Sequence, residues 1–318
     1  MPERFRIVAA FAAIYLVWGS TYLAIAAALP AIPPFALMGS RSLVGGLILF
    51  GLARARGARA GPREWLVGAA CGLLFFVGCH GVLAVAEQRV PTGLASILLA
   101  TIPFWTAIIG LVLPLDKPTR PRTLALLAPG FAGVALIAWR QLSDAGASAV
   151  DILMLLGASL SWALGSVVSE RHSGETPASA LSGMALISGG LALLGLAAAT
   201  GELRRVDLSG LVGVPGLAWL HLTLVGTVIA FGAYVWLLER VSPPLVATYT
   251  FVNPIVAVAL GWAVLDEMVT PAMLAGGALV LGSLVALLVL DPPAVKRKRD
   301  KEDSRDIRSL DPRCSAAR

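Results

Sequence analysis

Long apolar segments, each close to the length that crosses a bilayer, alternate with short polar segments along most of the chain. About 20 apolar residues span the hydrocarbon core as an α-helix. Backbone groups in lipid need partners within their own segment, and the alternation of barrel strands is absent, so helices are predicted. The pattern predicts an all-α membrane protein with ten transmembrane helices, at residues 7–29, 35–52, 65–86, 94–113, 124–139, 152–169, 178–200, 219–238, 245–265 and 272–290.

Composition and charge add an orientation to these helices. Charged residues make up 14% of the chain and the mean hydropathy is +0.82, which excludes an ordinary soluble enzyme. Lysine and arginine beside short loops are retained in the cytoplasm. With a cytoplasmic N-terminus, 20 of the 25 Lys and Arg lie in cytoplasmic segments, four lie outside and Arg41 lies within the second helix. Both termini are therefore predicted to be cytoplasmic.

The formal net charge of +6 belongs largely to residues 291–318, which hold nine of the 25 basic residues. Because the excess of positive charge is confined to this tail, no nucleic-acid partner is predicted. The tail is too polar to bury a core, so we predict a disordered cytoplasmic segment that fixes topology and meets anionic headgroups. The predicted partners are the lipid bilayer and a small-molecule substrate, and the predicted assembly is a monomer or homodimer.

The chain repeats itself at an offset of 151 residues, which carries Arg89-Val90 onto Arg240-Val241. We predict two five-helix repeats, residues 1–145 (the first half) and 146–290 (the second half). An odd number of spans inverts the second copy in the membrane, as in transporters that open a central site to each side in turn. The same offset aligns Pro103 with Pro254, Gly110 with Gly261, Asp116 with Glu267 and Thr119 with Thr270, while Trp18 falls near Trp162 at an offset of 144.

At these residues the chain resembles the EamA family of the drug/metabolite transporter superfamily. The likeness covers nearly the whole chain except the tail. In the first half it is carried by WGSTYLAI at 18–25, Pro33-Pro34, Arg41, AEQRVPTGLAS at 86–96 and Pro103, and in the second half by Trp162, residues 239–242, Asn253-Pro254 and Asp266-Glu267.

The resemblance implies a ten-helix bundle around a central cavity, with both termini in the cytoplasm. It also implies an inner-membrane transporter, an exporter of amino acids or other small metabolites or drugs, that works by alternating access. Two departures stand out: Cys79-His80 replaces a Gly-Asn type pair that relatives often carry, and Leu115-Asp116 is a weaker version of the acidic ending at Asp266-Glu267. The departure at Cys79-His80 affects the expected substrate, and the departure at Leu115-Asp116 affects only a loop.

Three ionisable residues fall inside or at the end of predicted helices: Arg41, His80 and Glu87. Such groups are costly in a membrane and usually face protein or a water-filled cavity. His80 and Glu87 are two helical turns apart on one face, so both are candidates for proton coupling. Alternatively, His80 bonds a neighbouring helix and Glu87 pairs with Arg89 at the interface. Arg41 either binds a substrate carboxylate or holds the bundle together.

Aromatic and polar positions within the spans complete the predicted cavity. Tryptophan normally lies at the headgroup region, so tryptophans deeper in the spans favour a cavity wall. The alternative is helix packing through small polar residues. The candidates for the substrate cavity are Trp18, Thr21, Arg41, His80, Trp105, Trp162, Ser166 and Asn253.

Pro103 and Pro254 occupy equivalent positions in the fourth and ninth predicted helices. Each proline removes one hydrogen bond within its helix and can bend it. We predict that the two residues form a pair of hinges.

Other functions lack their residue patterns. The three histidines form no HExxH pair, and no phosphate-binding glycine loop is present. Every lysine falls in a predicted loop or the tail, which excludes a retinal Schiff base, and Cys71, Cys79 and Cys314 lack metal-ligand spacing and are expected to be reduced. No enzyme activity, metal or cofactor is predicted. The alternative to a transporter is a channel or a receptor without solute turnover.

Overall fold

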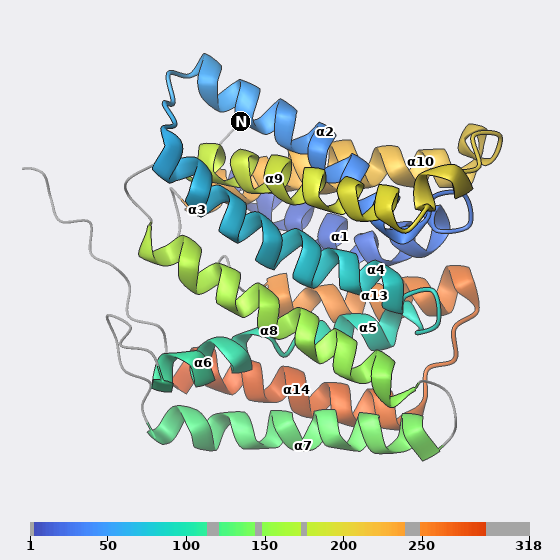
Figure 1. Ribbon diagram of the computed structural model, residues 1–318. Helices are drawn as coiled ribbons and strands as arrows, with labels where there is room; N and C mark the ends of the chain where they lie inside the picture. The colour runs from blue at the N-terminus through green and yellow to red at the C-terminus, as the bar shows by residue number, and fades with distance from the viewer. Residues whose placement is uncertain (1–2, 113–120, 144–147, 173–176, 239–248, 291–318) are drawn as a thin grey trace, which may run out of the picture.

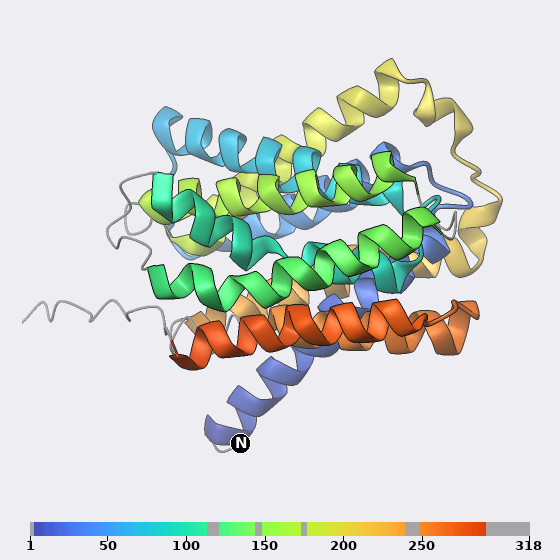
Figure 2. The same cartoon turned by 90° about the horizontal axis from the view of Figure 1, so that it is seen from below.

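The computed structural model describes residues 3–112, 121–143, 148–172, 177–238 and 249–290. Within these ranges every regular element is a helix, and the long helices run side by side in one bundle (Figure 1). The view in Figure 2 shows the start of α1 (Glu3–Ala28) standing out from the bundle. The tail predicted at residues 291–318 lies outside the described residues.

The helices follow the predicted apolar segments closely. They are α1 (Glu3–Ala28), α2 (Pro34–Ala55), α3 (Pro62–Gly72), η1 (Leu73–Gly81), α4 (Val82–Ala86), α5 (Thr92–Leu99), α6 (Ile102–Val112), α7 (Pro121–Ser143), α8 (Ala149–Arg171), α9 (Ala178–Ala199), η2 (Glu202–Arg205), η3 (Gly210–Val212), α10 (Val214–Leu220), η4 (His221–Ile229), α11 (Ala230–Leu238), α13 (Tyr249–Leu265) and α14 (Pro271–Leu290).

Among the described residues, seven helical segments are long and apolar enough to cross a membrane, and they coincide with seven of the predicted spans. Shorter apolar stretches lie where the other three spans are predicted, at Ala125–Ile137, Val252–Leu265 and Pro271–Ser283. The chain is therefore an all-helical, multi-pass membrane protein over the residues described. The total of ten spans and the cytoplasmic termini stay predictions.

The third predicted helix of each half contains a wide π-helical stretch. These stretches are η1 between α3 and α4, and η4 between α10 and α11, and each is nine residues long. Such segments are rare and frequently lie at functional sites. The apolar pattern does not predict them, because hydropathy is high through both segments whatever the hydrogen-bond spacing.

The two proline positions differ in local structure. The helix predicted at residues 94–113 is divided into α5 and α6. Pro103 lies in the first turn of α6, where backbone N–H groups have no partner within the helix, so the proline costs no intrahelical hydrogen bond. Pro254 lies inside the helix α13. The break between α5 and α6 is tied to α8, because the Thr101 and Ser159 hydroxyls lie 2.9 Å apart.

Equivalent helices of the two halves pack directly against each other through glycine. A Cβ atom on Gly190 of α9 would stand 2.7 Å from the backbone N of Leu43 in α2. A Cβ on Gly133 of α7 would stand 2.5 Å from the carbonyl oxygen of Gly276 in α14. Small residues allow this close approach of membrane helices. The second helices of the halves thus pair with one another, and so do the fifth.

Carboxylates of the second half close one end of the bundle, which we call the capped end. Oε2 of Glu202 accepts hydrogen bonds from the backbone N–H groups of Phe35 and Ala36 at the start of α2, at 2.8 and 3.0 Å. Glu267, beyond α13, binds the start of α5 in the same manner. Negative charge is stabilised at a helix N-terminus. The capped end is the side of Figure 1 where α8 begins and α13 ends.

Candidate functional site

A cavity lies inside the bundle between the two halves, with a volume of about 120 Å³. A single water needs roughly 10–15 Å³, so the cavity has room for a small solute. Its wall is built by α1, α2, η1, α4, α5 and α6 from the first half, and by α8, α9, η4, α11 and α13 from the second. The two π-helical stretches therefore face the cavity from opposite halves.

The charged wall of the cavity comes from the first half. Nη2 of Arg41 in α2 lies 3.0 Å from Nδ1 of His80 in η1. Because a guanidinium only donates, Nδ1 must accept, and the His80 ring is neutral with its proton on Nε2. Arg41 is only 5% exposed, and its Nε has no hydrogen-bond partner among the described residues. One donor of the guanidinium is thus buried without a partner.

The opposite wall is aromatic and is organised around Trp18 of α1. The indole N–H of Trp18 donates to the carbonyl oxygen of Gly226 in η4, at 3.0 Å. Its ring packs against Tyr249, Tyr234 and Phe231, with centroids 4.6, 5.4 and 6.2 Å away. A first-half side chain is thereby fixed to three helical segments of the second half.

A second aromatic group joins the charged wall to α8. The Trp162 ring lies 5.2 Å from the His80 ring and 4.7 Å from that of Phe75, between centroids. The Phe76 ring also packs against His80, at 5.4 Å between centroids. These contacts hold the imidazole in place against Arg41.

Six of the eight predicted cavity residues line this cavity. The six are Trp18, Thr21, Arg41, His80, Trp162 and Asn253, and the predicted hinge Pro254 lines it as well. Oδ1 of Asn253 is buried without a hydrogen-bond partner among the described residues.

Trp105 and Ser166 are not among the residues that line the cavity. The Trp105 indole donates to Oγ of Ser159 at 2.9 Å, and Ser166 donates to the carbonyl oxygen of Trp162. Trp105 packs in a small apolar cluster with Ile109 and Ala163. Both side chains join helices to one another or to their own backbone.

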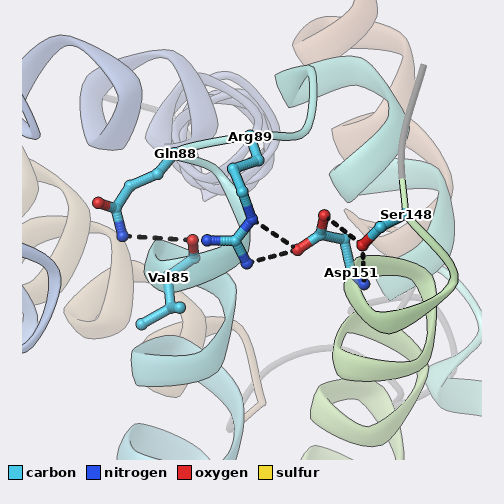
Figure 3. Close-up of polar contacts among 5 residues, drawn as sticks. All are labelled: Val85, Gln88, Arg89, Ser148 and Asp151. Carbon is cyan, nitrogen blue, oxygen red and sulfur yellow. Dashed lines mark hydrogen bonds and ion pairs between the residues drawn. The ribbon is translucent and has the colours of Figure 1, made fainter. Parts of the chain in front are cut away.

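Glu87 is not paired with Arg89. The Arg89 guanidinium binds Oδ1 of Asp151 in α8, through Nε at 2.9 Å and Nη2 at 2.5 Å (Figure 3). Hydrogen bonding to Asp151 raises the pKa of Arg89 above its ordinary value. Ser148 donates to the other carboxylate oxygen of Asp151, at 2.8 Å. The predicted interfacial pair of Glu87 with Arg89 is wrong, because Arg89 binds Asp151, which is distant in sequence.

Several cavity residues were missed from the sequence. Phe76, Phe231 and Tyr249 line the cavity but resemble ordinary apolar helix residues in a chain this hydrophobic. The spacing of Phe76, one helical turn before His80, was the one available signal. Cys71 and Cys79 are free and buried, as predicted, and Cys79 lines the cavity.

No cluster of metal-ligating side chains was found among the described residues. In that part of the chain the cavity wall also holds no aspartate or glutamate. The site therefore presents one permanent cation, one neutral imidazole and aromatic rings. This chemistry suits a solute with a carboxylate or another anionic group and an apolar body.

Comparison with known sequences matches this chain to one family. The EamA-like transporter family matches residues 5–139 and again residues 150–289. The chain is 36% identical over 253 residues to a protein of Escherichia coli (strain K12) named "Uncharacterized inner membrane transporter YedA", which covers 78% of this chain and 79% of that protein. It is 26% identical over 283 residues to a "Probable amino-acid metabolite efflux pump" of Salmonella typhimurium, covering 85% and 91%.

A solved crystal structure has a similar fold. The TM-score is 0.62 at 22% sequence identity, and the likeness covers 92% of this chain and 98% of the other. At this identity the comparison supports the arrangement of the helices alone.

Proposed function

Because the chain belongs to the EamA-like transporter family, we propose that it exports amino acids or other small metabolites across the bacterial inner membrane. The single observation that carries the proposal is the Arg41–His80 pair in the cavity between the halves. Relatives named as an inner membrane transporter and as an amino-acid metabolite efflux pump support the location and the substrate class.

Arg41 supplies the recognition of the solute. Its charge persists at any physiological pH, and a guanidinium binds a carboxylate in a planar, two-bond geometry. His80 accepts one guanidinium N–H and so fixes the orientation of the group. The aromatic rings around Trp18 and Trp162 bind the apolar part of the solute.

The mechanism is alternating access between two inverted five-helix halves, residues 1–145 and 146–290. The pairing of α2 with α9 and of α7 with α14 supports a pseudo-twofold arrangement. The cavity lies between the halves, so a change in their relative position would expose it to either side. Pro103 and Pro254 are the proposed hinges.

The proposed topology has ten transmembrane helices with both termini in the cytoplasm. The distribution of lysine and arginine supports it. In this orientation the capped end faces away from the cytoplasm. The cavity is then closed from the outside by the contacts of Glu202, Glu267 and Asp151.

Counterflow in proteoliposomes tests the function. Vesicles holding the purified protein are loaded with an unlabelled amino acid, and entry of the labelled compound is followed, with protein-free vesicles as the control. A transporter exchanges labelled for unlabelled solute, so uptake should rise with the internal concentration. Uptake without this stimulation indicates a channel. Absence of uptake across a panel of amino acids, other carboxylates and drugs would contradict the proposal.

A further inference from the structure

Glu87 follows α4 at the capped end and is buried, with 7% of its surface exposed. Neither carboxyl oxygen has a hydrogen-bond partner among the described residues. Arg89 offers no compensation because it is bound to Asp151. A carboxylate removed from water without a partner carries a large desolvation penalty, so burial favours the neutral acid.

The charges around Glu87 act in opposite directions. Arg41 of α2 attracts a negative charge on Glu87, whereas Glu267, beyond α13, repels it. Burial and the like charge together oppose ionisation while the capped end is closed. The other titratable groups on the elements packed around it are Tyr22 of α1, Asp151 of α8, which is bound to Arg89, and Cys79 and His80 of its own helix.

The Glu267 carboxylate accepts hydrogen bonds from three donors. Its Oε1 accepts from the backbone N–H of Thr92 at 2.7 Å, and its Oε2 accepts from the Thr92 hydroxyl at 3.0 Å and from the N–H of Gly93 at 3.2 Å. These donors begin α5, where the helix dipole also favours an anion. The contact therefore joins the end of α13 in the second half to the start of α5 in the first.

The backbone after α13 is shaped for this contact. Asp266 has a φ of 54°, in the left-handed region, and the N–H of Glu267 returns to the carbonyl oxygen of Gly261 at 3.1 Å. This turn directs Glu267 toward α5. A Cβ atom on Gly261 would stand 2.7 Å from the Thr92 hydroxyl oxygen, so the glycine provides the space that the contact needs.

The equivalent positions at the opposite end have different chemistry by sequence. The offset of 151 carries Asp116 onto Glu267, but it carries Thr92 and Gly93 onto Pro243 and Pro244. A proline has no backbone N–H to donate. By sequence, the second half therefore lacks an equivalent of the two backbone N–H donors that bind Glu267.

We propose that Glu87 is the proton-binding residue of a gate at the capped end, which closes when Glu87 is protonated and opens when it ionises. The inference rests on the transport function proposed above. On closing, the Glu87 carboxylate takes one proton from the water at that end and becomes uncharged. The loss of repulsion lets Glu267 cap α5, and opening returns the proton to the same water.

The thiol of Cys79 reports on this gate because it lines the cavity and is fully buried. In a variant that retains Cys79 as its only cysteine, a membrane-impermeant maleimide is added outside spheroplasts, and the alkylation rate is measured from pH 6 to pH 8. The Glu87→Gln variant, which mimics the protonated acid, is measured in parallel. Dividing the two rates removes the pH dependence of the thiol itself.

The ratio of the wild-type rate to that of Glu87→Gln should rise with pH, by up to about tenfold per pH unit, the limit for one linked proton. The Glu267→Gln and Gly261→Ala variants weaken the cap and should be alkylated faster at every pH, with less dependence on pH. Glu64→Gln, which alters the carboxylate that binds the Gly61 N–H at the start of α3, is the matched control and should behave as wild type.

A ratio that does not change with pH would overturn the proposal, as would slower alkylation of Glu267→Gln. If the Glu87→Gln protein is not inserted into the membrane, the alkylation rates of Glu87→Asp and of the two cap variants test the gate instead, since the Asp carboxyl can still bind and release a proton. The assay requires no solute. A failed counterflow experiment with pH-dependent alkylation would therefore reject the proposed function and retain the gate.

Discussion

The two halves that enclose the cavity are repeats of one sequence, yet they contribute different chemistry to its wall. The first half provides Arg41 and His80, which are hydrogen-bonded to each other. The second half provides rings, a glycine carbonyl and neutral polar groups, among them Tyr249, Gly226 and Asn253. The backbones of the halves remain alike, as the π-helical stretches η1 and η4 show.

This difference indicates which features belong to the scaffold and which to the solute. In the proposed mechanism, features that both halves share, such as the π-helical stretches, would serve the movement of one half against the other. Features in one half alone would give the cavity a direction, because the proposed solute has its carboxylate toward Arg41 and its apolar group toward Phe231 and Tyr249 of the second half. Substitutions that remove the difference should therefore impair transport most.

Arg41→Lys should have the largest effect. The charge is kept, but the planar pair of donors and the contact with His80 are lost. Hydrogen bonds to charged groups contribute about 1.5–3 kcal/mol, so counterflow should fall roughly ten- to hundredfold. Arg204→Lys, at an exposed site, is the matched control and should transport normally. Normal counterflow in Arg41→Lys would assign Arg41 to bundle structure.

Trp18→Phe should have a smaller effect. The change keeps most of the aromatic contacts but removes the hydrogen bond to Gly226 that joins the halves. The loss of about 1 kcal/mol corresponds to a roughly fivefold change in apparent affinity, measured as the half-saturation concentration for counterflow. Trp262→Phe, exposed on α13, controls for loss of an indole. Equal behaviour of the two variants would show that the Trp18 bond is dispensable.

Pro103→Ala and Pro254→Ala test the shared scaffold. Each should lower the transport rate several-fold without changing surface expression. Pro254→Ala restores an N–H inside α13, and Pro103→Ala removes the ring that fixes φ in the first turn of α6. Pro129→Ala, inside α7 and outside the cavity wall, is the control. If transport is unchanged in both hinge variants, the prolines are not hinges.

His80→Gln should have the smallest effect. The Gln carbonyl can still accept from Arg41, so transport should fall less than about threefold. Its pH dependence should match wild type, because a ring that accepts from a guanidinium at Nδ1 is a poor proton carrier. A loss of pH dependence in this variant would indicate that His80, and not Glu87, is the proton-binding residue.

Much of the fold could be predicted from the sequence because bilayer thickness fixes helix length. The predicted spans agree with the helices to within a few residues, as for α9 (Ala178–Ala199), predicted at 178–200. The break between α5 and α6 was signalled only by Pro103. The π-helical stretches were not predictable, since they change hydrogen-bond spacing within segments that are apolar throughout.

The cavity was partly predictable because charge and indole groups are conspicuous inside a membrane. Arg41, His80, Trp18 and Trp162 were identified in this way. The capped end was not, since Asp151, Glu202 and Glu267 each bind a segment more than 60 residues away in sequence. A loop carboxylate that caps a distant helix cannot be distinguished, from sequence alone, from a loop carboxylate that is exposed to solvent.

The most direct test of the solute site uses protection of Cys79, which lines the cavity with Arg41. With Cys79 as the only cysteine, a solute that shows counterflow should slow maleimide alkylation in a saturable manner, and Arg41→Lys should abolish this protection. Protection that persists in Arg41→Lys, or a transported solute that leaves the rate unchanged at saturation, would contradict binding in this cavity.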